Sequence, residues 1–152
     1  MCLMSSLPYN LFMADIGYSG TPLVKKLGVK PQLQMLTINA PKEYTTWLGD
    51  LPEGVKLITK ATTPIDAAHL FATDRVVLDV TLSKLRKELK QDGFVWVSWH
   101  KKSSKIPTDI TEDIIREIAL PFGFVDVKVC AVSEIWSGLK LVIRKSERQS
   151  IY

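Results

Sequence analysis

The residues best suited to chemistry lie in one polar run of this 152-residue sequence. His100 is followed by three lysines and two serines within five positions, and then by the string Pro107-Thr108-Asp109. Lysine ammonium groups attract a bound anion, and hydroxyl groups offer it directed donors. The run therefore predicts a clamp for a small phosphate- or carboxylate-bearing ligand. Its predicted members are Lys101, Lys102, Ser104, Lys105 and Thr108. The alternative is a solvated loop whose nearby acidic residues only complement the dipole of the next helix.

Two tryptophans complete the candidate site. Trp99 directly precedes His100 at the end of an apolar stretch, and it either packs in the core or stacks on a ligand. Trp136 has the same two explanations, with packing at a sheet edge preferred. A non-catalytic interaction protein, using this edge or Trp136 to hold a protein partner or a second copy of itself, is the alternative to ligand binding.

The histidines and cysteines have structural explanations beside catalytic ones. His100 could pair with Asp74 as an acid–base couple, although a histidine just after a strand is more often ordinary. His69 lies in an apolar stretch and is expected to be a satisfied core residue. Cys130 has apolar neighbours, and nothing nearby in sequence would lower the pKa of its thiol. Cys2 and Cys130 lack metal-ligand spacing, so no metal site is expected.

Alternating strand and helix patterns position these residues. Apolar stretches predict strands at residues 34–39, 55–59, 67–72 and 94–99. The clearest helix carries a leucine every three or four residues along one side; Thr73 or Asp74 would cap it and Gly93 would end it. Three further helices are expected, which begin at Pro22, at Pro41 and after a cap at Thr108 or Asp109. Residues 124–132 and 139–144 read as an antiparallel pair.

This order of elements predicts the fold class. Strands that alternate with helices imply right-handed crossovers and a mostly parallel sheet. We expect a Rossmann-like three-layer open α/β sheet with a C-terminal antiparallel pair, similar to a reduced class I methyltransferase fold. One domain is expected over residues 16–146, with an N-terminal extension at 1–15 and a tail at 147–152.

The expected ligand-binding edge lacks the residues that common cofactors use. In open α/β sheets, ligands bind outside the carboxyl ends of the strands. A dinucleotide or S-adenosylmethionine site needs glycines after the first strand and commonly an acid after the second. Here the first turn is Asn39-Ala40-Pro41 and the second strand ends at Thr59-Lys60. No cofactor is therefore predicted. The helix from Pro41 could still hold a small anion at its positive end, or Asn39 only caps that helix.

Composition sets broader limits on function. The chain is 46% hydrophobic and 24% charged, which is typical of globular proteins. No apolar run approaches the roughly 20 residues of a membrane span, and the start does not resemble a signal peptide. Two distant cysteines favour a reducing cytoplasm, and the lack of a long apolar run argues against a membrane partner. A net charge of +4 indicates lysines spread over the surface, with weak nucleic-acid binding as a second alternative.

Short strings along the chain also form a pattern. They lie at residues 17–23, 25–28, 39–41, 51–52, 96–99, 101–102, 104–105, 107–109, 111–112, 125–132 and 136–140. Together they resemble a bacterial family catalogued as domain of unknown function 3052. The resemblance covers about residues 17–144 and implies a Rossmann-like fold and a cytoplasmic bacterial setting, without an activity. In two departures, His100 stands where the family often has proline, and the residues before Met13 lie outside the pattern.

Overall fold

A six-stranded sheet runs through the part of the chain that the computed structural model describes, residues 21–62 and 64–148. Its strands are β1 (Gln34–Ile38), β2 (Lys56–Ile58), β3 (Ile65–Phe71), β4 (Leu89–His100), β5 (Phe124–Ala131) and β6 (Trp136–Ile143). Their order in the sheet is β2-β1-β3-β4-β6-β5. The pairs among β1 to β4 are parallel, whereas β6 is antiparallel to both β4 and β5. This arrangement confirms the predicted open sheet with a C-terminal antiparallel pair. The predicted extension at residues 1–15 lies outside the described residues.

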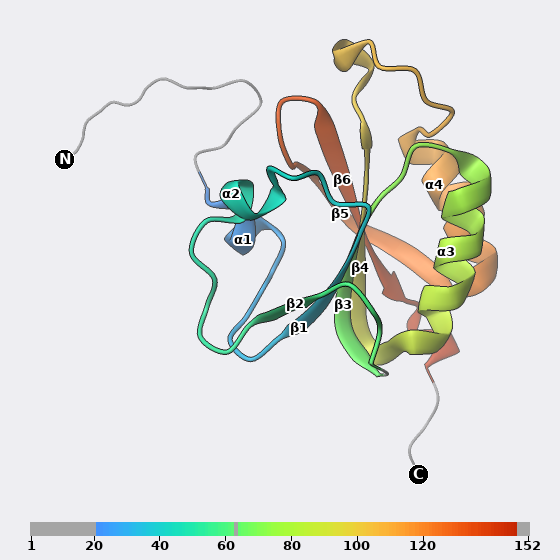
Figure 1. Cartoon of the computed structure of the whole chain (residues 1–152). Helices are drawn as coiled ribbons and strands as arrows, with labels where there is room; N and C mark the ends of the chain where they lie inside the picture. The colour runs from blue at the N-terminus through green and yellow to red at the C-terminus, as the bar shows by residue number, and fades with distance from the viewer. Residues whose placement is uncertain (1–20, 63, 149–152) are drawn as a thin grey trace.

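Helices cover both faces of this sheet (Figure 1). The α-helices are α1 (Leu23–Lys26), α2 (Tyr44–Leu48), α3 (Arg75–Glu88) and α4 (Glu112–Ala119). Three short 3-10 turns are η1 (Lys102–Ser104), η2 (Leu120–Phe122) and η3 (Lys145–Glu147). Because successive side chains of a strand point to opposite faces, β3 and β4 supply residues to both layers. Leu70 and Val97 pack in the layer of α3 and α4, whereas Phe71 and Trp96 pack in the layer of α1 and α2.

The long helix α3 begins where the sequence predicts. The Asp74 side chain accepts a hydrogen bond from the backbone N–H of Val77 at 2.9 Å, which is a standard N-cap. The buried leucines of α3 face the sheet; they are Leu78, Leu82 and Leu85. Among the described residues, no helix is long and apolar enough to cross a membrane.

The end of α3 differs from the prediction. The helix ends at Glu88 because Leu89 has extended backbone and already belongs to β4. Gly93, expected to terminate the helix, lies within β4 instead. A Cβ at this glycine would lie 2.7 Å from the carbonyl oxygen of Asp66, so the close approach of β3 and β4 requires glycine there.

Two other helices begin later than predicted. Asn39 has a left-handed backbone with φ of 58° and does not cap α2, which begins at Tyr44 after Glu43. The predicted helix start at Pro41 is therefore wrong. Helix α4 is capped by Thr111, whose hydroxyl accepts from a backbone N–H at 3.2 Å. Asp109 does not cap it, because its carboxylate accepts the backbone N–H of the first α3 residue.

Trp96 joins the central sheet to α1. Its fully buried indole Nε1–H donates to the backbone carbonyl of Leu27 at 2.9 Å. Leu27 directly follows α1 and is itself fully buried, so no water can replace the donor. This hydrogen bond fixes the end of α1 against β4.

We expect Trp96→Phe to lower the free energy of unfolding by roughly 2–3 kcal/mol, because it removes the indole donor and leaves the Leu27 carbonyl buried without a partner. Urea unfolding measures the change. Val80→Ala is the control: Val80 is 64% exposed, so its substitution should change stability by less than about 0.5 kcal/mol. Equal stabilities of the two variants would contradict this role of Trp96.

Candidate functional site

A pocket of about 590 Å³ opens at the carboxyl edge of the sheet, in the layer of α1 and α2. Its walls come from the turn after β1 together with α2, from the end of β4 and from the tip of the β5–β6 hairpin. Its lining residues are Pro41, Glu43, Trp47, His100, Ser133, Glu134, Ile135 and Trp136. We call this site the edge pocket. It lies where open α/β sheets usually bind ligands.

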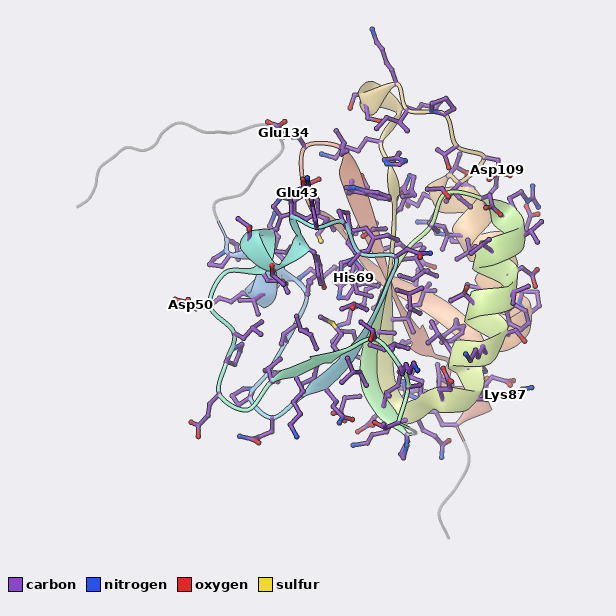
Figure 2. The ribbon with its side chains drawn as sticks, in the orientation of Figure 1. Glu43, Asp50, His69, Lys87, Asp109 and Glu134 are labelled. Carbon is purple, nitrogen blue, oxygen red and sulfur yellow. The ribbon has the colours of Figure 1, made fainter. Side chains whose placement is uncertain are left out.

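The lining of the edge pocket favours a positively charged ligand. Glu43 and Glu134 lie close to the hairpin tip (Figure 2), and both are exposed. Neither carboxylate is in an ion pair within residues 21–62 and 64–148. Trp47 is half-buried and Trp136 is buried, and the face of an indole ring attracts cations. The pocket therefore combines two negative charges with two aromatic walls.

His100 also lines the edge pocket. Its ring packs on Trp136 with ring centroids 3.9 Å apart and an angle of 31° between the planes. Burial lowers the pKa of His100, which keeps the ring neutral at pH 7. The predicted acid–base couple does not form, because Asp74 caps α3 in the other layer.

A buried polar network lies under the edge pocket. The Tyr44 hydroxyl and Nδ1 of His69 are 2.7 Å apart, and Nε2 of the same ring lies 2.7 Å from the Ser98 hydroxyl. The side chains of Tyr44, His69 and Ser98 are all buried. His69 stacks on Phe71 at 4.4 Å, and Phe71 meets Trp136 edge to face at 5.0 Å. The network thus supports the floor of the pocket.

The structure confirms that His69 is a satisfied core residue. Both ring nitrogens have neutral hydroxyl partners, and desolvation lowers the pKa of His69 to about 3. The unfolded chain has an ordinary histidine pKa near 6.5, so it binds more protons than the folded protein between these values. The contribution of His69 to the free energy of unfolding is therefore fully present above pH ~6.5 and is lost as the pH falls toward 3.

We expect the His69 ring to show no protonation in NMR spectra recorded between pH 5 and 8. The free energy of unfolding should fall by up to about 1.4 kcal/mol per pH unit below pH ~6.5 from this residue, and His100 adds a smaller loss of the same sign. Urea unfolding at pH 7, 6 and 5 should give a shallower slope for His69→Gln than for the wild type. A His69 resonance that titrates near pH 6.5 would contradict the buried network.

The hydroxyl groups of the predicted clamp already donate to backbone carbonyls. The Ser104 hydroxyl donates to the carbonyl of Lys101 at 2.6 Å and accepts from the N–H of Ile106 at 3.2 Å. The Thr108 hydroxyl donates to the carbonyl of Thr73 at 2.8 Å. Ser104 therefore stabilises its own loop, and Thr108 joins the loop to the segment after β3, so neither hydroxyl proton is free to be donated to a ligand.

The structure divides the predicted site residues between two pockets. A second pocket of about 480 Å³ is lined by five of them, Trp99, Lys101, Lys102, Lys105 and Thr108. Trp136 lines the edge pocket, whereas Asn39 and Ser104 line neither. His100 borders both pockets. Sequence reasoning missed Glu43, Trp47 and Glu134. The only signal for Glu134 is its place in the short polar turn between two β-rich runs.

The turn after β1 forms without glycine. Asn39 adopts the left-handed backbone that glycine usually supplies, and asparagine tolerates it better than most residues. The lack of glycine therefore does not prevent the tight turn, although the Asn39 side chain occupies space that glycine would leave open. Two residues after Asn39, Pro41 has no backbone N–H that could bind a ligand. After β2, the exposed Lys60 stands where nucleotide sites commonly have an acid.

No protein family model matches this sequence, and no curated protein matches it. Solved structures do match. A Sulfolobus solfataricus protein classed as a type 11 methyltransferase has a TM-score of 0.60 at 13% identity, over 87% of this chain and 94% of its own. An S-adenosylmethionine-dependent methyltransferase from Aquifex aeolicus has a TM-score of 0.60 at 13% identity, over 84% and 91%. The fold is that of a class I methyltransferase. The resemblance to domain of unknown function 3052 stays a prediction.

These neighbours overturn the predicted function. A third match, the Aeropyrum pernix fibrillarin solved with natively bound S-adenosylmethionine, has a TM-score of 0.52 at 11% identity, over 83% of this chain and 70% of its own. All three neighbours share the fold of this chain. The predicted binding of a small anion is wrong in view of these neighbours, and so is the alternative of a non-catalytic interaction module. A homodimer and weak nucleic-acid binding stay predictions.

S-adenosylmethionine combines a positive sulfonium and an amino-acid end with a nucleoside. The usual contact to the ribose cannot form here. Lys60 stands where an acidic residue commonly follows the second strand, and it cannot accept a hydrogen bond from a ribose hydroxyl. The edge pocket does suit its positive end, because carboxylates and indole faces both attract a sulfonium. The residues that would hold that end are Glu43, Trp47, Glu134 and Trp136.

Proposed function

We propose that this protein is a methyltransferase that uses S-adenosylmethionine and binds its positive end in the edge pocket. The observation that carries the proposal is the acid–aromatic lining of a pocket at the carboxyl edge of a methyltransferase fold. The pocket borders the turn after β1, where the left-handed Asn39 turns the chain. When bound, S-adenosylmethionine supplies a methyl group activated by a positive sulfur.

The protein's own residues would bind and orient this group. Glu43 and Glu134 lower the energy of a positive charge from two walls of the pocket. Trp47 and Trp136 present aromatic surface that stabilises a cation and excludes water from it. Because burial lowers its pKa, His100 stays neutral at pH 7 and does not repel a positive ligand.

Charge recognition would supply most of the affinity for S-adenosylmethionine. Pro41 and Lys60 occupy the positions that usually hold the nucleoside, and neither favours it. Binding should therefore depend on the sulfonium charge more than on the ribose. S-adenosylhomocysteine has the same nucleoside and amino-acid end with a neutral sulfur, which makes it the matched comparison.

Isothermal titration calorimetry tests the proposal. We expect S-adenosylmethionine to bind about tenfold more tightly than S-adenosylhomocysteine. The double variant Glu43→Gln, Glu134→Gln should lose roughly five- to thirtyfold in affinity for the sulfonium compound, since each exposed carboxylate contributes about 0.5–1 kcal/mol. Its affinity for the thioether should change little.

The control double variant is Asp50→Asn, Glu53→Gln, which changes the net charge equally at exposed residues that do not line the edge pocket. It should bind both compounds as the wild type does. Equal affinities of the wild type for the two compounds, or no binding of either, would contradict the proposal.

A further inference from the structure

The two ring nitrogens of His100 are in different environments. Nδ1 is buried and has no hydrogen-bond partner among the described residues. Nε2 is not a buried atom without a partner in the way that Nδ1 is, and the His100 side chain lines the edge pocket. The ring is held in place by its packing on Trp136. His100 therefore has one covered nitrogen and one nitrogen that a ligand can reach.

This difference determines which nitrogen carries the proton. A neutral imidazole has one N–H donor and one bare acceptor nitrogen. A proton on Nδ1 would create a buried donor without a partner, and orphaned buried donors are rarer and more costly than unpaired acceptors. The proton therefore resides on Nε2, and His100 presents a hydrogen-bond donor.

Besides the indole N–H groups of Trp47 and Trp136, the pocket has acceptors on its two carboxylates and on Ser133. Glu43 and Glu134 are carboxylates, which have no donor when ionised. The Ser133 oxygen already accepts from the backbone N–H groups of Ile135 and Trp136 at 3.3 and 3.2 Å. A ligand that satisfies both kinds of group needs a positive centre and an acceptor oxygen.

We propose that His100 is a specificity residue of the edge pocket, and that its Nε2–H selects onium compounds that carry an acceptor oxygen over simple cations. The inference rests on the proposed function, because it requires the pocket to bind a positive ligand. It goes beyond that function in naming the second group that the ligand must carry. Sulfonium compounds with an amino-acid end have both groups.

Two small probes separate the contribution of the positive charge from that of the acceptor oxygen. S-methylmethionine has a sulfonium and an amino-acid end, whereas trimethylsulfonium has only the positive charge. We expect the wild type to bind S-methylmethionine at least fivefold more tightly in NMR titrations. His100→Leu removes the donor and should lose this preference, while its affinity for trimethylsulfonium stays the same. His100→Gln keeps an N–H donor of similar reach and should retain most of the preference.

The outcomes distinguish this inference from the proposed function. If His100→Leu weakens both probes equally, or weakens neither, His100 does not select the oxygen and the inference is wrong, while the proposed function stands. If the wild type binds neither probe nor S-adenosylmethionine, both are wrong. Long-range ¹H–¹⁵N correlation spectra of the wild type give an independent test without a variant. They should show the proton of His100 on Nε2, and a proton on Nδ1 would overturn the inference.

Discussion

The hydrogen bond between the Tyr44 hydroxyl and His69 connects the core of this protein to its candidate site. Helix α2 has only five residues, and a helix of that length is not stable without tertiary contacts. Tyr44 is its first residue, so the bond to β3 fixes where the helix begins. Glu43 and Trp47 flank that point, and they form one wall of the edge pocket. The position of this wall therefore depends on a polar contact in the core.

The alternation of side chains along β4 separates two environments at the same sheet edge. Trp99 enters the layer of α3 and α4, and the next residue, His100, enters the opposite layer against Trp136. The lysine-bearing loop contributes to the pocket on the first side, while both carboxylates contribute to the pocket on the second. Two pockets of opposite charge thus share a single strand end, and the proposed binding of a positive ligand concerns the acidic one.

The sequence predicts the sheet well because hydrophobic periodicity is a local signal. It also predicts a cap at Thr73 or Asp74, of which Asp74 is observed, and the satisfied state of His69. Prediction from the sequence fails where two helix starts could use the same capping side chain. Asp109 reads as a cap for α4, but the start of α3 takes its carboxylate. The edge pocket escapes sequence reasoning for another reason. Glu43 and Glu134 are distant in the chain and meet only because the β5–β6 hairpin returns to the turn after β1.

The four tryptophans of this chain allow a direct measurement of where a sulfonium ligand binds. Trp47 and Trp136 line the edge pocket, Trp99 lines the lysine-bearing pocket, and Trp96 is buried in the core. In ¹H–¹⁵N spectra recorded during titration with S-adenosylmethionine, the indole N–H signals of Trp47 and Trp136 should shift while those of Trp96 and Trp99 stay in place. Shifts confined to Trp99, or no shift at all, would contradict binding in the edge pocket.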